Sequence, residues 1–381
     1  MSELQKLVDR PSAEGRVPGA VALIATPDGR REVVTGGTRS VGGEPMTRDT
    51  LFRIASITKP IVAAATMVLV ERGHLALDDE VRRWLPELAA PQVLRSPTGP
   101  LDDVVPAERA ITVRDLLTFQ SGHGFIPDFG APAMQLLFEQ LLQGPPQPQL
   151  VPAPDEWMAR LSRIPLVHQP GRGWTYNTGS DILGVLLARA ESAGLPDVLA
   201  DTVLEPLGMR DTGFATPAGD LDRFASYYQR AESGGLTLVD SPDGQWSSLP
   251  AFPSAAGGLV STADDWCTFG RMLLAGGEHA GRAVLSPRSV EQMMTRHAHA
   301  EAGNIFLDGQ AWGFGGGVDV NSDQPWNVPG RYGWIGGTGT AGYVIPSTGV
   351  VAVWLAQLQL QGPDDFSVLS EFLTHAATVG R

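Results

Sequence analysis

Lysine is almost absent from this chain of 381 residues, although lysine and arginine together number 28. It occurs only at Lys6 and Lys59, and every other basic side chain except histidine is arginine. An arginine keeps its proton in proteins, whereas a buried lysine can give its proton up. We therefore expect Lys59 to have a chemical role; the simpler alternative is a composition that favours arginine and a lysine of no special function.

Cysteine is equally rare, because Cys267 is the only one. A single thiol excludes an internal disulfide and a cysteine-based zinc site. Cys267 lies in a predicted amphipathic helix and no partner histidine can be assigned to it, so we interpret it as a core residue rather than a nucleophile. The seven histidines include no His-x-x-x-His pair. We predict no metal and no other cofactor.

An excess of positive charge is also missing, since the net charge is -14. This balance argues against nucleic acid and anionic membranes as partners. No apolar run approaches the roughly 18 residues of a membrane span, and the first six residues lack the apolar region of a signal peptide. With 43% hydrophobic and 18% charged residues, the chain can form a large core. We expect a cytoplasmic protein.

The stretch from Ser56 to Val70 predicts a helix buried on most sides. It should begin at about Ser56, because Pro60 is tolerated only in a first turn, and Gly73 suits its C-terminal cap. The Ser56 N–H would then be unpaired, and Lys59 would lie one turn further on the same face. A hydroxyl beside an amine at a buried helix start indicates nucleophilic catalysis.

Strand patterns occur at both ends of the chain. Residues 20–25 and 32–35 predict a hairpin, and residues 333–344 and 350–357 predict two further strands. These segments can share one antiparallel sheet, with helices at 264–274, 286–295 and 366–378 covering its faces. The fold class is α/β of the α+β type.

Between these ends, residues 76–215 predict a mostly helical insert. Helical patterns begin at 77, 112, 134, 154 and 181, and Thr112 and Asp115 have the spacing of a capping box. Residues 1–75 and 216–381 would form the sheet domain, and the active site would lie at the interface of the two domains. The loops 90–110 and 125–155 are expected to shape the pocket.

Tyr176 is a candidate partner for the Ser56 helix. It follows a Pro-Gly turn and Trp174 and precedes a helix, which places it at the edge of the insert. A positive charge on Lys59 would favour its phenolate. The alternative is a packed tyrosine whose hydroxyl bonds the backbone.

A G-x-G-x-x-G pattern occurs at Gly337, Gly339 and Gly342. A dinucleotide site requires this pattern between a strand and a helix, whereas here a strand and a hairpin follow. We interpret the glycines as allowing a substrate to lie against a strand.

Taken together, three motifs resemble the serine β-lactamase and penicillin-binding superfamily, and within it the class C β-lactamase-like carboxylesterases of family VIII. The motifs are Ser56-x-x-Lys59, Tyr176 after Pro170-Gly171-x-x-Trp174, and Trp334-x-Gly336-Gly337. The resemblance covers nearly the whole chain and implies a central antiparallel sheet flanked by helices, with an inserted helical domain.

The resemblance also implies a mechanism. Ser56 would be the acylated nucleophile, Lys59 would take or share its proton, and Tyr176 would act as general base and then as acid to the leaving alcohol. The oxyanion hole would be the backbone N–H groups of Ser56 and Gly337.

Two departures from the family pattern bear on the substrate. β-Lactamases have Tyr-x-Asn, whereas Thr178 stands at that position and Asn177 is adjacent to Tyr176, so its side chain need not point the same way. Lys-Thr-Gly is replaced by Trp334-Ile335-Gly336, so no lysine can hold a β-lactam carboxylate there.

We therefore predict a hydrolase of small or medium carboxylic esters. The alternatives are an acyltransferase or amide hydrolase on the same scaffold, or a weak β-lactamase or D-aminopeptidase. Trp334, Gly336, Phe125 and Trp174 are candidate substrate-binding residues, although Phe125 and Trp174 could instead be packed in the core or the insert. The oligomeric state is left open.

Overall fold

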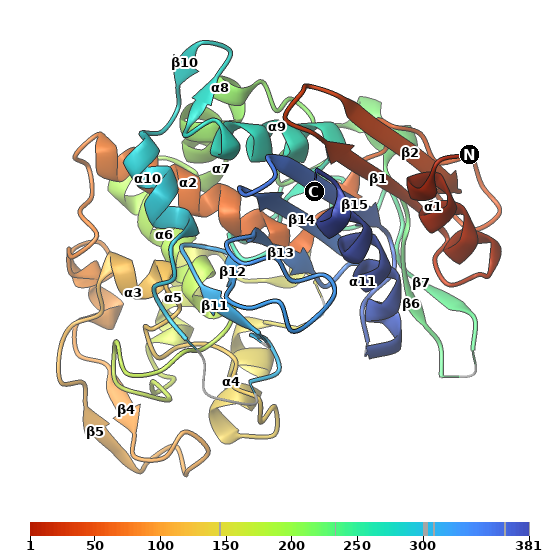
Figure 1. Ribbon diagram of the computed structural model, residues 1–381. Coiled ribbons are helices and arrows are strands. Elements are labelled where there is room, and N and C mark those ends of the chain that lie inside the picture. The colour runs from red at the N-terminus through yellow and green to blue at the C-terminus, as the bar shows by residue number, and fades with distance from the viewer. Residues whose placement is uncertain (145, 233, 300–303, 308, 362, 381) are drawn as a thin grey trace.

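The computed structural model, which describes all residues except 145, 233, 300–303, 308, 362 and 381, contains a seven-stranded sheet in the order β11-β12-β13-β14-β15-β1-β2 (Figure 1). Every neighbouring pair is antiparallel. Its strands are β1 (Gly19–Ala25), β2 (Arg31–Gly37), β11 (Gln310–Trp312), β12 (Gly317–Asp319), β13 (Tyr332–Gly336), β14 (Thr340–Ile345) and β15 (Val350–Ala356). Because β1 pairs with β15, the two ends of the chain share one sheet, and this prediction is confirmed.

Helices cover both faces of this sheet. The N-terminal helix α1 (Glu3–Ala13) and the C-terminal helix α11 (Pro363–Thr378) lie on one face, while α2 (Lys59–Glu71) and α9 (Ala263–Leu274) lie on the other (Figure 1). Alternation along β1 produces the two layers, because successive side chains of a strand point to opposite faces. One layer receives Ala20, Ala22 and Ile24, and the other receives Val21, Leu23 and Ala25.

Residues 76–215 lie beside the sheet, and their regular structure is mainly helical. Their helices are α3 (Val113–Leu117), α4 (Pro132–Leu141), α5 (Pro154–Leu161), α6 (Thr178–Glu191), α7 (Leu195–Leu199) and α8 (Glu205–Leu207). The Thr112–Asp115 capping box is present at the start of α3. A short hairpin of β4 (Gln92–Leu94) and β5 (Val104–Pro106) was not expected. The domain boundaries stay a prediction, since one hydrophobic cluster includes side chains of α2, α6 and α9.

Several elements differ from the sequence prediction. Residues 333–344 form two strands, β13 and β14, rather than one, because the chain reverses at Gly339, whose φ of 83° suits glycine. The helix expected from residue 77 is only the 3₁₀ turn Val81–Arg83. The helix α1 was not predicted.

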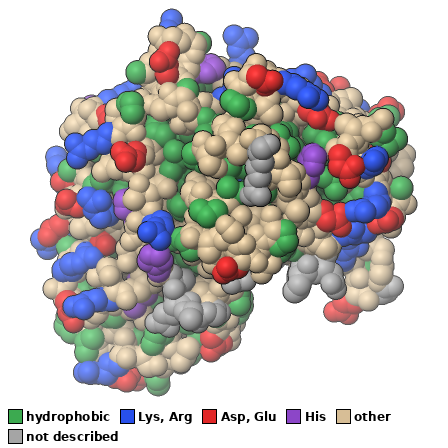
Figure 2. All heavy atoms as spheres, in the orientation of Figure 1, with side chains coloured by type: hydrophobic (Ala, Val, Ile, Leu, Met, Phe, Trp, Pro, Cys, Tyr) green, Lys and Arg blue, Asp and Glu red, His purple; other side chains and the backbone are tan. Residues whose placement is uncertain are grey.

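The smaller elements complete the chain. They are α10 (Pro287–Met294) and the strand pairs β3 (Phe52–Arg53) with β8 (Val260–Ser261), β6 (Tyr227–Arg230) with β7 (Leu236–Asp240), and β9 (Glu278–His279) with β10 (Arg282–Ala283). In the described part of the chain, no helix is long and apolar enough to cross a membrane. On the face shown in Figure 2, acidic and basic side chains are interspersed.

Candidate active site

Ser56 lies in a tight turn that leads into α2. Residues Ala55–Thr58 form a 3₁₀ turn and the α-helix begins at Lys59, so the first turn is tighter than the predicted α-helical one. Ala55 has a φ of 45°, a conformation that is uncommon for residues other than glycine. As a first-turn group, the Ser56 N–H has no acceptor within the helix. The turn brings Ser56 to the wall of a pocket.

Lys59 is buried among neutral hydrogen-bond acceptors. Its Nζ donates to Ser56 Oγ at 2.8 Å, to Asn177 Oδ1 at 2.9 Å and to the Ala256 carbonyl at 2.6 Å. The same Nζ lies 4.8 Å from the centre of the Tyr176 ring. Burial lowers the pKa of Lys59, and the negative charge of Asp181 opposes this shift. A lysine in this environment gives up its proton more easily than one in water.

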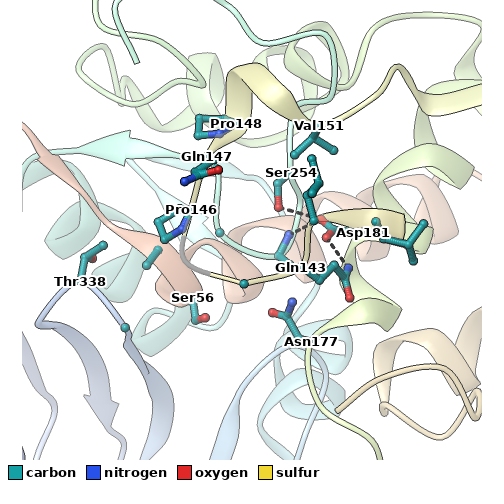
Figure 3. Close-up of a pocket in the computed structure, with 18 of the residues that line it drawn as sticks. Ser56, Gln143, Pro146, Gln147, Pro148, Val151, Asn177, Asp181, Ser254 and Thr338 are labelled. Carbon is teal, nitrogen blue, oxygen red and sulfur yellow. Dashed lines mark hydrogen bonds between the residues drawn. The ribbon is translucent and has the colours of Figure 1, made fainter. Parts of the chain in front are cut away.

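Asp181, in the first turn of α6, is a buried carboxylate that the sequence analysis did not identify. It accepts hydrogen bonds from Ser254 Oγ at 2.7 Å, the Ala256 N–H at 2.9 Å and Gln143 Nε2 at 3.0 Å (Figure 3). Burial raises the pKa of Asp181, and these hydrogen bonds and Lys59 oppose the shift. Ala256 therefore links Asp181 to Lys59, through its N–H on one side and its carbonyl on the other.

Tyr176 lies against Ser56 and Lys59. The Trp334 indole Nε1 donates to its hydroxyl at 2.6 Å, and its backbone exchanges two hydrogen bonds with Phe125. Burial raises the pKa of Tyr176 to about 12, although hydrogen bonds with Ser56 and Trp334 act in the opposite direction. The phenol therefore stays protonated at neutral pH, which differs from the expectation that a charged Lys59 would favour the phenolate.

Asn177 points toward Lys59 because the backbone reverses sharply at this residue. Its φ of 79° and ψ of -66°, with a hydrogen bond of 3.1 Å from the Thr178 N–H to the Tyr176 carbonyl, define a γ-turn of the rare positive-φ type. The departure from Tyr-x-Asn therefore does not remove the asparagine from the site. The sequence contained one signal for this reversal, because asparagine tolerates a positive φ better than most residues.

The turn between β13 and β14 lies beside the Ser56 turn. A Cβ on Gly336 would lie 2.1 Å from Thr340 Oγ1 and 2.6 Å from the Ile54 carbonyl, so only glycine fits there. A Cβ on Gly337 would meet nothing within 4 Å, and Gly337 lines the pocket. The structure thus brings Gly337 and Ser56 into the lining of one pocket.

The pocket has a volume of about 350 Å³, and residues 141–144, 146–148 and 151 line part of it. Pro146, Gln147 and Pro148 pass above Ser56 (Figure 3). Much of the lining is apolar: Phe125, Leu141, Leu142, Pro146, Pro148, Val151, Trp157, Trp246, Phe252 and Leu360. Among the described residues, Asp181 is the one charged side chain in the lining. The chemistry of this pocket suits neutral, apolar groups.

The other candidate positions differ in their relation to this pocket. Phe125 lines it, but Trp334, Gly336 and Trp174 do not. Trp334 donates a hydrogen bond to Tyr176, and the centre of the Trp174 ring lies 6.0 Å from that of the Tyr176 ring. Both tryptophans therefore pack against Tyr176 without lining the pocket. Of the two expected loops, 125–155 contributes lining residues, with residue 145 outside the described part, and 90–110 contributes none.

The described part of the chain contains no group of three or more histidine, cysteine, aspartate or glutamate side chains placed to hold a metal ion. Cys267 is buried in α9, and burial raises the pKa of its thiol to about 11. Its thiolate is therefore disfavoured at neutral pH.

Comparisons with known proteins match nearly the whole chain. The family model described as Beta-lactamase matches residues 4–369. Protein Rv1367c of Mycobacterium tuberculosis (strain ATCC 25618 / H37Rv) is 39% identical over 90% of this chain and 86% of its own length. Esterase EstB of Burkholderia gladioli is 33% identical over 69% of this chain and 67% of its own length.

The solved structures show the same relationship. The structure titled "EstCE1, a hydrolase with promiscuous acyltransferase activity" is 26% identical, with a TM-score of 0.78 over 98% of this chain and 97% of that one. The predicted α+β architecture of the β-lactamase type is therefore confirmed.

Proposed function

This chain belongs to the Beta-lactamase family and is an enzyme of the serine hydrolase class, and within that class we propose that it hydrolyses neutral carboxylic esters through an acyl-enzyme on Ser56. The observation that carries the proposal is the 2.8 Å hydrogen bond between Lys59 Nζ and Ser56 Oγ, at the wall of a mostly apolar pocket. The similarity to an esterase, EstB, supports the same reaction class.

Acylation begins with Lys59 as the base. Its lowered pKa makes the neutral amine accessible near neutral pH, so Nζ can take the Ser56 proton while Oγ bonds to the ester carbonyl carbon. The Ser56 and Gly337 N–H groups would bind the negative oxygen. Since Lys59 lies among neutral acceptors, the proton it receives is not held by a direct carboxylate partner.

The leaving group departs with the help of Tyr176. Because its pKa is raised to about 12, the phenol is protonated and can donate to the departing alcohol oxygen as the carbon–oxygen bond breaks. Lys59 then returns its proton to the phenolate. Water attacks the acyl-enzyme by the reverse transfers: it loses a proton to the same pair of residues, and Ser56 recovers its hydroxyl proton.

The pocket selects against anionic substrates. A substrate carboxylate entering the pocket would meet Asp181 and no arginine or lysine in the described lining. Trp334 stands where related β-lactamases have lysine, and its indole N–H donates a hydrogen bond to the Tyr176 hydroxyl. These features favour small or medium neutral acyl groups over β-lactams.

The test is a panel of p-nitrophenyl esters from acetate to octanoate, run beside nitrocefin. We expect turnover of the esters, little turnover of nitrocefin, and no turnover by Ser56→Ala. A fluorophosphonate should phosphonylate the native protein and Ser162→Ala, a control at an exposed serine, with loss of fluoride and a matching gain in mass, but it should not modify Ser56→Ala. Full ester turnover by Ser56→Ala would disprove the proposal.

Acyl transfer is the second candidate function. It is favoured by the likeness to EstCE1, which is described as a hydrolase with promiscuous acyltransferase activity. Supplying an alcohol acceptor and measuring new ester against free acid decides between the two. Ester product that never exceeds free acid at high acceptor concentration would favour hydrolysis.

A further inference from the structure

The two N–H groups of the proposed oxyanion hole belong to distant parts of the chain. Ser56 lies in the turn before α2, and Gly337 lies in the turn between β13 and β14. Donors aimed at an oxyanion contribute most when they are held in place before the reaction. A displacement of about 1 Å can cost about a hundredfold in rate, so contacts between these two turns matter for catalysis.

Two buried threonine hydroxyls connect the turns. Thr338 Oγ1 donates to the Arg53 carbonyl at 2.6 Å, and Thr340 Oγ1 donates to the Ile54 carbonyl at 2.9 Å. Thr338 is 2% exposed and Thr340 is fully buried. The acceptors are consecutive carbonyls, and Ile54 directly precedes the left-handed residue Ala55. The turn that carries Gly337 is therefore fastened to the segment that leads into Ser56.

Other contacts leave little room for an alternative arrangement. A Cβ on Gly336 would lie 3.2 Å from the Ala55 Cβ, so the two turns are in close contact. The Gly337 carbonyl accepts from the Leu360 N–H at 2.9 Å, which fixes the Gly337–Thr338 peptide, the one that follows the Gly337 N–H. The left-handed backbone of Ala55 persists only if its surroundings hold it, and Thr340 bonds the carbonyl of the peptide that enters this residue.

We propose that Thr338 and Thr340 are positioning residues for the oxyanion hole, which fix the Gly337 N–H relative to the Ser56 N–H. This inference rests on the proposed function, because it assigns these two hydroxyls to the same reaction. Thr338 also lines the pocket, whereas Thr340 does not. Because both hydroxyls donate to backbone carbonyls, their loss should weaken stabilisation of the tetrahedral intermediate more than ester binding.

The experiment compares valine and serine at each position. Thr338→Val and Thr340→Val keep the shape and remove the hydroxyl, so each should lower kcat about tenfold with little change in KM. Thr338→Ser and Thr340→Ser keep the hydroxyl and should recover most of that loss. Inhibition by butylboronic acid, which forms a tetrahedral adduct with a serine oxygen, should weaken by a similar factor in the valine variants.

Thr202→Val is the matched control. Thr202 is also 2% exposed and also donates to a backbone carbonyl, that of Val198, at 2.6 Å. The Thr202 hydrogen bond lies within one helical segment, so this variant should keep kcat, and melting curves of all the variants separate a loss of stability from a loss of rate. Wild-type kcat and boronate affinity in both valine variants, with Ser56→Ala inactive, would overturn the positioning role alone. An active Ser56→Ala would instead overturn the function on which it rests.

Discussion

Arg53 and Lys59 are two buried cations on one short segment, and they differ in what surrounds them. Arg53 is 4% exposed and pairs with Asp240, while its guanidinium lies 4.0 Å from the centre of the Phe224 ring. Lys59 is 1% exposed and has only neutral acceptors in hydrogen-bond contact. Burial without a paired charge favours the neutral amine, whereas a paired arginine stays charged. The same segment thus contains a structural cation and a candidate base.

The largest effect is expected when Lys59 is made unable to release a proton. Lys59→Arg keeps the positive charge, but arginine cannot act as a base. We expect kcat on p-nitrophenyl butyrate to fall by about 10³-fold, within the range that general acid–base catalysis contributes. Steady-state kinetics and a melting curve on the same preparation measure the effect on a folded protein.

Lys6→Arg is the matched control for this substitution. Lys6 is the other lysine of the chain, and it forms an exposed pair with Glu3, so this variant should keep wild-type kinetics. Activity of Lys59→Arg within tenfold of the wild type would contradict the assignment of Lys59 as the base.

A smaller effect, and one on stability rather than rate, is expected at the other cation. Asp240→Asn leaves the Arg53 guanidinium buried without its counter-charge, which should cost about 3–5 kcal/mol in the free energy of unfolding. Urea denaturation measures this change. The matched control is Asp201→Asn, because Asp201 pairs with Arg72 at the surface and an exposed pair contributes about 0–1 kcal/mol. Equal losses in the two variants would contradict a structural role for the buried Arg53–Asp240 pair.

The sequence was most informative where residue types are rare. Lysine occurs twice and tyrosine five times, so Lys59 and Tyr176 stood out, and the structure brings both to Ser56. The antiparallel sheet followed from short apolar runs and turn residues at the two ends of the chain. These features depend on local pattern and composition, which a single sequence contains.

Other features depend on contacts between distant segments. Asp181 is one acidic residue among many in the sequence, and its partner Ala256 lies 75 residues away. Trp334 was expected to line the pocket, but its indole bonds Tyr176 instead. Asn177 faces Lys59 only because of a backbone reversal that a family pattern of Tyr-x-Asn argued against. Packing and hydrogen bonding decide these positions, and composition carries no signal for them.

The smallest effect should come from Asp181, the charge that opposes the shift at Lys59. Ester hydrolysis should rise with pH as Lys59 loses its proton, at a pH below the ordinary lysine pKa because burial lowers the pKa of Lys59. Asp181→Asn removes a negative charge that favours the ammonium form, so the acidic limb of kcat/KM should move to lower pH. Tyr176, with a pKa raised to about 12, should not titrate in this range.

A pH series of kcat/KM on p-nitrophenyl butyrate measures this limb, and Asp78→Asn, at a side chain that is 80% exposed, should leave it unchanged. Asparagine can still accept from Ser254 and the Ala256 N–H, so the segment that bonds Lys59 stays in place. If the acidic limb of kcat/KM stays at the wild-type pH while the rate falls, Asp181 acts only by holding in place the segment that contains Ala256. A limb that moves to higher pH would contradict the proposed electrostatic balance, because removing a nearby negative charge cannot stabilise the protonated amine.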